Sequence, residues 1–135
     1  MEIVQNLIGS TVNEVIAGGS NGSMVVIEAD HNYVLFLYCC WRLNDSDSIL
    51  CGWNDQESYL IRIKELEGDR IQSMNMDGFY DFVMRFASGR ELRVMCDLTP
   101  GCENGQEENW SICDKKTNVC YVVNNQLQPI ETKFS

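Results

Sequence analysis

The chain has little positive charge. Ten lysines and arginines stand against twenty aspartates and glutamates, and the formal net charge is −10. The deficit is greatest in residues 1–60, where Arg42 is the only base. An acidic surface repels nucleic acid and anionic membranes, and it attracts basic proteins. The composition therefore predicts a basic protein partner, with no nucleic-acid ligand and no membrane association.

Long hydrophobic runs are also missing. The longest, residues 33–41, has the length of a strand and falls far below the roughly 20 residues of a membrane-spanning helix. Near the N-terminus Glu2 stands where a secretory signal needs a base, and the apolar run that follows is too short for one. We therefore expect a cytoplasmic protein. In that reducing environment the seven cysteines are expected to be free thiols that pack as small hydrophobic residues.

Patterns typical of catalysis or metal binding are scarce. His31, the only histidine, lies between Asp30 and Asn32 in a predicted hairpin turn, where polar residues are common. A Cys-His or Ser-His nucleophilic pair would have to use it, and nothing nearby supports such a pair. The cysteines contain no C-x-x-C spacing. The sequence thus predicts no catalytic residue, no metal and no cofactor, and an enzyme using thiols or carboxylates is the weakest alternative.

A pattern of apolar residues occurs twice in the chain. Residues 7–37 align with residues 66–96 at an offset of 59 without a gap, and this alignment matches Gly9 to Gly68 and Val12 to Ile71. Further on, the offset is 69, which pairs Trp41 with Trp110 and Cys51 with Cys120. A fixed offset of this kind indicates a repeated structural unit. We predict one domain over residues 1–135, with repeats at about 1–53 and 54–123 and an acidic insertion at 97–109.

Each repeat is predicted to contain a short helix and about five strands. The helices cover residues 2–7 and about 56–66, the second with a buried stripe of Tyr59, Leu60, Ile63 and Leu66. Alternating apolar residues predict hairpins around residues 25–37 and 82–94, and the strand at 33–38 is apolar on both faces and is expected to be central and covered on both sides. The tail, residues 124–135, has a weak pattern, and its end is expected to be loose. The fold class is therefore α+β, strand-rich, with two pseudo-symmetric repeats of mainly antiparallel strands around one core.

Two acidic zones without lysine or arginine are the candidate binding residues. The first acidic zone lies within residues 43–61 and the second within residues 94–114. Their candidate residues are Asp45, Asp47, Trp53, Asp55 and Glu57 in the first, and Asp97, Glu103, Glu107 and Glu108 in the second. Carboxylates around an aromatic anchor suit the capture of a basic protein surface. The alternative is that the acids only face water, and Trp41 and Trp110 are expected to be core residues.

The order of these elements resembles that of known small proteins. The residues that carry the resemblance are Trp41-Arg42-Leu43, Leu66-x-Gly68-x-x-Ile71, Asp81, Phe86, Gly89, Leu92 and Trp110. The pattern is similar to small uncharacterised bacterial proteins of duplicated α+β build and to some immunity proteins of polymorphic toxin systems. The resemblance spans roughly residues 7–121 and implies a fold, with no catalytic residue to carry over.

Charge and resemblance together favour a non-catalytic binding protein. The specific hypothesis is an immunity protein whose acidic loops cover the basic active site of a cognate toxin. The alternative is an orphan interaction or housekeeping domain with another partner. The oligomeric state is not predicted by the sequence.

Overall fold

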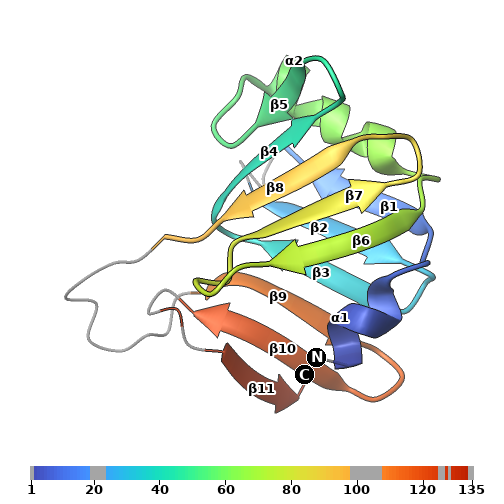
Figure 1. Cartoon of the computed structure of the whole chain (residues 1–135), viewed down its shortest axis with the longest axis vertical. Helices are drawn as coiled ribbons and strands as arrows, with labels where there is room; N and C mark the ends of the chain where they lie inside the picture. Colours follow the sequence, from blue (N-terminus) through green and yellow to red (C-terminus); the bar gives the residue numbers. More distant parts are fainter. Residues whose placement is uncertain (1, 19–23, 98–107, 125–126, 128, 134–135) are drawn as a thin grey trace.

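The computed structural model describes residues 2–18, 24–97, 108–124, 127 and 129–133, and these form two antiparallel β-sheets packed face to face (Figure 1). The six-stranded sheet has the order β1-β2-β3-β9-β10-β11, and the five-stranded sheet has the order β5-β4-β8-β7-β6. The strands are β1 (Val12–Ala17), β2 (Val25–Ala29), β3 (Tyr33–Leu37), β4 (Cys40–Asn44), β5 (Ile49–Gly52), β6 (Ile71–Met76), β7 (Phe82–Phe86), β8 (Glu91–Met95), β9 (Glu108–Asp114), β10 (Val119–Asn124) and β11 (Pro129–Lys133). The predicted strand-rich α+β class is confirmed.

The core lies between the two sheets. It is built mainly from alternate residues of strands β1 to β10, since successive side chains in a strand point to opposite faces. The largest fully buried side chains are Trp41, Trp110, Phe82, Phe86, Ile27, Leu37, Leu43, Ile63, Leu66, Ile71, Met84 and Leu92. Both tryptophans are therefore core residues, as expected, and they are unavailable to a partner.

Each half of the chain gives three consecutive strands to one sheet and a hairpin to the other, and the second half adds β11 beside its hairpin. Val12 begins β1 and Ile71 begins β6, and each is followed by a bulge, which agrees with the offset of 59. From the next strand the offset is 57, because seven residues connect β1 to β2 and five connect β6 to β7. The gapless alignment is thus wrong beyond the first strand. The pseudo-symmetric duplication itself stays a prediction.

The sheet registers also separate two cysteines that the sequence alignment had matched. Cys51 lies opposite Leu43 and is buried in the core. Cys120 lies opposite Cys113, on the outer face of the six-stranded sheet. The prediction that Cys51 and Cys120 occupy equivalent core positions is therefore wrong, because the second hairpin is shifted by one residue and side chains alternate between faces.

The helical segments close the edges of the sandwich. Helix α1 (Glu2–Leu7) has the predicted bounds. The second helix is split into α2 (Glu57–Leu60) and a 3-10 segment η2 (Ile61–Leu66), and Gln56 precedes it without a side-chain cap. Its residues Leu60, Ile63 and Leu66 are buried as predicted, but Tyr59 is 56% exposed. The prediction for Tyr59 is wrong because the buried stripe has the three-residue spacing of Leu60, Ile63 and Leu66, which the 3-10 segment imposes, and Tyr59 lies outside this spacing.

Segment η2 protects the open edge of β1. The Lys64 ammonium donates a hydrogen bond to the Val15 carbonyl at 3.1 Å, and the Glu67 carboxylate accepts one from the Val15 amide at 2.9 Å. These side chains replace the strand that an exposed edge would otherwise recruit. At the opposite edge lies β11, a strand that was not predicted from the weak pattern of the tail and that pairs with β10 along its whole length. Its residues are all exposed, so the sequence carries no apolar alternation there.

The outer face of the six-stranded sheet carries a small cluster of its own. Cys113, Cys120 and Val122 are buried there, and the half-buried Phe36 packs against them. Strand β3 lies between β2 and β9, so it is central as predicted. Its outward side chains Val34 and Phe36 are buried and half-buried, and Tyr38, just after the strand, is 39% exposed. The expectation of cover on both sides stays a prediction.

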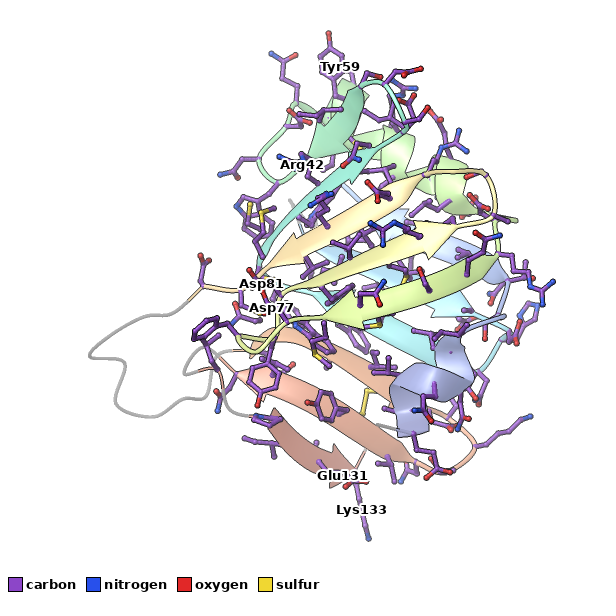
Figure 2. The ribbon with its side chains drawn as sticks, in the orientation of Figure 1. Arg42, Tyr59, Asp77, Asp81, Glu131 and Lys133 are labelled. Carbon is purple, nitrogen blue, oxygen red and sulfur yellow. A yellow bond between two sulfur atoms is a disulfide. The ribbon has the colours of Figure 1, made fainter. Side chains whose placement is uncertain are left out.

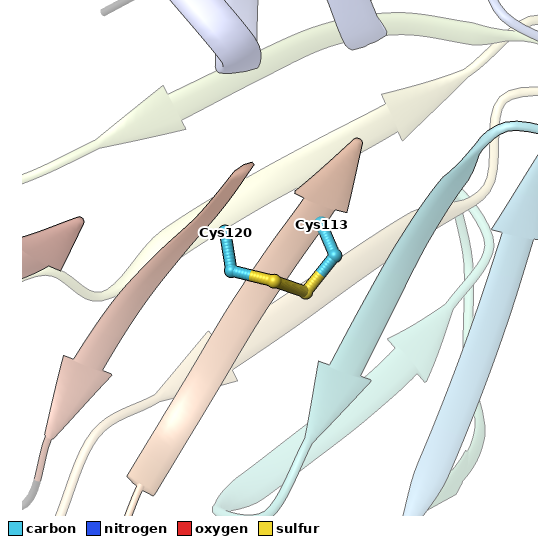
Figure 3. Close-up of a disulfide and its surroundings, with 2 residues drawn as sticks. All are labelled: Cys113 and Cys120. Atoms are coloured by element: carbon cyan, nitrogen blue, oxygen red, sulfur yellow. A yellow bond between two sulfur atoms is a disulfide. The ribbon is translucent and has the colours of Figure 1, made fainter. Parts of the chain in front are cut away.

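Cys113 and Cys120 form a disulfide between β9 and β10 (Figure 3). The expectation that all cysteines are free is therefore wrong for this pair. Register explains the link, because the two residues lie directly opposite each other in an antiparallel hairpin. Four other cysteines within the described residues are free: Cys39, Cys40, Cys51 and Cys96.

Replacing both Cys113 and Cys120 with serine should lower the free energy of unfolding by about 2 kcal/mol, since a short loop loses its closure constraint. Urea unfolding monitored by circular dichroism measures the loss. The control is Cys51→Ser in the core, which tests hydroxyl burial without a disulfide. If the double variant is as stable as the parent protein, this link contributes nothing to the fold.

Candidate functional site

The first acidic zone lies at the end of the sandwich formed by the β4–β5 turn, β5 and α2, at the top of Figure 1. Asp45 has a structural role in this turn. Its carboxylate accepts hydrogen bonds from the amides of Asp47 and Ser48, at 2.8 and 2.7 Å. These bonds favour the charged form and lower the pKa of Asp45. Asp47 itself is exposed.

The loop between β5 and α2 holds the other members of this zone. The Asp55 carboxylate accepts a hydrogen bond from the Gly52 amide at 2.7 Å. Trp53 is half-buried, packs against the core and donates its amide to the Trp41 carbonyl at 2.9 Å. Glu57 is exposed in the first turn of α2, where the helix favours a negative charge. Trp53 therefore anchors the loop from inside and offers only part of its ring to a partner.

Three exposed apolar side chains occupy the same end of the molecule. Ile49 in β5, Tyr59 in α2 and Ile61 in η2 are 65%, 56% and 53% exposed. Both helical segments pack against β5, so these side chains come from elements in contact. Figure 2 shows Tyr59 projecting from this end into solvent. We call the set Asp47, Ile49, Asp55, Glu57, Tyr59 and Ile61 the β5–α2 patch.

The second acidic zone begins where β8 ends and β9 starts. Asn109 fixes this point, because its side chain bonds the amide and the carbonyl of Asp97 at 2.8 and 2.9 Å. The Asp97 side chain is exposed. Glu108 is exposed as a residue, yet nearby protein removes water from its carboxylate and raises its pKa. Glu103 and Glu107 lie outside the described residues.

The two zones do not form one continuous surface. Figure 1 shows the β4–β5 turn and α2 at one end of the sandwich, while the described end of β8 and the start of β9 lie at a different side. A single partner contacting both would have to reach around the molecule. The first zone is the only one of the two whose predicted residues all lie within the described part of the chain.

The outer face of the five-stranded sheet is basic, which sequence reasoning missed. Arg42 and Arg93 lie directly opposite each other there, and Arg85 belongs to the same face. Glu91 partly neutralises this group, with its carboxylate 2.8 Å from Arg85 Nε and 3.6 Å from Arg93 Nη2. The sequence did contain a signal for this basic face, because each arginine stands between two buried apolar residues in an alternating strand and must therefore point outward. The acidic charge is thus concentrated at the ends of the sandwich.

A groove of about 570 Å³ lies between α1 and strands β10 and β11. Its lining includes Ile3, Tyr121 and the carboxylate residues Glu2, Asp114 and Glu131. Sequence reasoning missed it because β11, which forms one wall, has no apolar alternation. The Asp114 carboxylate is already occupied by hydrogen bonds from Asn32 and from the turn after β9.

Catalytic and metal chemistry gain no geometric support from the described residues. His31 is exposed in the β2–β3 turn, and its imidazole Nδ1 lies 3.8 Å from Glu28. No group of three or more histidine, cysteine, aspartate or glutamate side chains in the described part is arranged to hold a metal ion. No helix of that part has the length and hydrophobicity needed to cross a membrane.

Comparisons with protein-family models, with curated proteins and with solved structures found no match to this chain.

Proposed function

We propose that this chain is a non-catalytic protein-binding domain, and specifically an immunity protein that neutralises a cognate basic toxin. The observation that carries the proposal is the β5–α2 patch, where exposed apolar side chains stand among carboxylates. Of the two bases near this patch, Arg62 is bonded to Glu65 at 2.9 Å, and Arg42 is half-buried in β4 opposite Gly52. Such a surface suits a partner with a basic rim around an apolar centre.

The apolar and the acidic side chains of the β5–α2 patch would have different roles in binding. Tyr59 and the two isoleucines supply the apolar area that a partner would bury, and tyrosine is common among residues that dominate binding energy. The carboxylates of Asp47, Asp55 and Glu57 would speed the encounter with a basic surface and fix its orientation. The patch rests on the sheets through Leu60 and Ile63, which are buried, so it is presented on a rigid base.

Truncating Tyr59 to alanine should weaken binding to the partner by at least about tenfold, mainly through faster dissociation. The partner to assay is the purified product of the adjacent reading frame, and surface plasmon resonance gives both rates. Phe79→Ala is the matched control, since Phe79 is 71% exposed on the β6–β7 turn and its truncation removes an aromatic ring away from the patch.

The outcomes discriminate between the candidate functions. Loss of binding for Tyr59→Ala but not for Phe79→Ala supports the patch as the binding site. Equal binding by both variants shows that the β5–α2 patch is not the binding site. If the parent protein does not bind the product of the adjacent reading frame at all, the immunity hypothesis is rejected and an interaction domain with another role is left. Raising the salt concentration should slow association with a basic partner, because exposed charges are screened.

A cytoplasmic location stays a prediction. The Cys113–Cys120 disulfide argues against a cytoplasmic location, because disulfides persist mainly in oxidising compartments. A toxin partner that acts outside the cytoplasm is consistent with an immunity protein that carries a disulfide. The duplicated origin of the fold is also part of this proposal, and it rests on the matched strand order and bulges of the two sheets.

A further inference from the structure

Two free cysteines face each other where the chain passes between the sheets. Cys39 comes directly before β4 and Cys96 comes directly after β8. These strands are antiparallel neighbours, with Cys40 opposite Met95 and Trp41 opposite Val94. Extending this register by one residue places Cys39 opposite Cys96. Cys39 is two residues before Trp41, and Cys96 is two residues after Val94, and both Trp41 and Val94 are buried in the core. Because side chains two residues apart in a strand lie on the same face, both cysteines point into the sandwich.

The two thiols are in contact and differ in accessibility. Cys39 is 1% exposed, whereas Cys96 is half-buried and packs against the same core. The Cys96 thiol donates a hydrogen bond to the Tyr80 carbonyl at 3.3 Å. A hydrogen bond with Cys96 and burial both raise the pKa of the Cys39 thiol. Because it is the more accessible of the two, Cys96 is the thiol that a reagent reaches first.

Continuing the β4–β8 register by one residue would give the backbone the spacing that a disulfide needs. Directly opposed residues of antiparallel strands have Cα atoms about 4.5–5.5 Å apart, which lies within the range of about 4.4–6.8 Å found across disulfides. Cys113 and Cys120 stand in the same opposed relation in this molecule and are bridged. A bond between Cys39 and Cys96 would thus require side-chain rotation and little movement of the main chain.

We propose that Cys39 and Cys96 are a redox-active pair, which a small disulfide such as oxidised glutathione converts to a second cross-strand disulfide. The Cys96 thiolate attacks one sulfur of oxidised glutathione, and one glutathione thiolate leaves. The Cys39 sulfur then attacks Cys96 Sγ and gives its proton to the second departing glutathione. Two protein thiols are oxidised and one glutathione disulfide is reduced to two thiols. The redox pair does not depend on the proposed function.

The bond would join the two places where the chain passes from one sheet to the other. Residues 38–39 lead from the six-stranded to the five-stranded sheet, and Cys96 begins the return path toward β9. Asp97, the first residue of the second acidic zone, is the next in sequence. Oxidation would therefore fix the start of that zone to the core, and the linked cysteines would be 57 positions apart in the chain.

The test is to equilibrate the full chain in glutathione buffers of increasing oxidised fraction, block free thiols by alkylation, and map disulfides by mass spectrometry. The expected product is a peptide pair joined through Cys39 and Cys96, with the chain lighter by two hydrogen atoms. Its melting temperature should rise by roughly 5–15 °C, because a long loop is closed. Cys39→Ser should stop at a mixed glutathione disulfide on Cys96, and Cys96→Ser should leave Cys39 unmodified.

Cys51→Ser and Cys40→Ser are the matched controls, and both should still form the new link. Cys51 is a buried thiol whose pKa burial raises to about 11, and it has no described cysteine opposite it. Preferential joining of Cys96 to any cysteine other than Cys39 would overturn the proposal. So would a Cys39 that stays reduced in fully oxidised glutathione while Cys113 and Cys120 remain bridged.

Discussion

Replacing Trp110 with alanine is expected to lower the free energy of unfolding by about 4 kcal/mol. Trp110 is fully buried in β9, and its ring packs edge-to-face against Phe82 with the two ring centroids 5.0 Å apart. Its indole Nε1 also donates a hydrogen bond to the Tyr80 carbonyl at 2.9 Å. The truncation leaves a cavity between the sheets and removes one of two donors to that carbonyl, the other being the Cys96 thiol, so the cavity accounts for most of the cost.

Guanidinium unfolding monitored by far-ultraviolet circular dichroism measures the change without relying on tryptophan fluorescence. Trp53→Ala is the matched control, since Trp53 is only half-buried, and its expected cost is about 1–2 kcal/mol. Equal costs for the two variants would show that Trp110 does not join the two sheets. Trp110→Phe should recover much of the loss, because it refills most of the cavity.

Replacing Asp114 with alanine should cost about 3 kcal/mol at neutral pH. Asp114 is buried at the end of β9, and its carboxylate accepts hydrogen bonds at 2.9 Å from the Asn32 side chain and from the Lys116 amide. Burial alone would raise its pKa, but these bonds outweigh burial and the pKa of Asp114 is lowered. Alanine leaves the buried Asn32 amide without its acceptor.

The same carboxylate makes the cost depend on pH. A group whose pKa is lower in the folded state stabilises the fold above its unfolded pKa, about 3.9 for aspartate, and this contribution is lost as the pH falls through the folded pKa. The difference in stability between the parent protein and Asp114→Ala should therefore be constant near pH 7 and shrink below about pH 4.

Unfolding in urea across that pH range provides the measurement. Asp47→Ala is the control, since Asp47 is exposed in the β4–β5 turn, and its cost should be small. If the Asp114 variant loses the same stability at every pH, packing rather than charge explains the role of this residue.

The sequence was sufficient where local patterns decide the outcome. Alternation in residues 82–94 predicted the β7–β8 hairpin, and the bounds of α1 were confirmed to the residue. The core positions of Trp41 and Trp110 were also predicted correctly. Period-two and helical patterns report which face of an element is buried, and this information is contained within a few neighbouring residues.

Features that depend on pairing between distant strands could not be predicted. Strand β11 forms because β10 offers it an edge, and its own residues are all exposed. The Cys113–Cys120 bond and the facing pair of Cys39 and Cys96 depend on register, which one residue of slip would reverse. The grouping of Arg42 with Arg93, 51 positions apart, has the same cause.

The candidate site was likewise predicted only in part from the sequence. The acidic character of the β4–α2 region was visible in the sequence, because charge is a property of composition. The exposure of Ile49, Tyr59 and Ile61 beside these acids was decided only by tertiary structure. The amino-acid sequence by itself thus determined the strand-rich class, the core tryptophans and the acidic charge, since these follow from local pattern and composition. The tertiary structure decided which surfaces and which cysteines meet, because strand order and register are set by contacts between residues far apart in the chain.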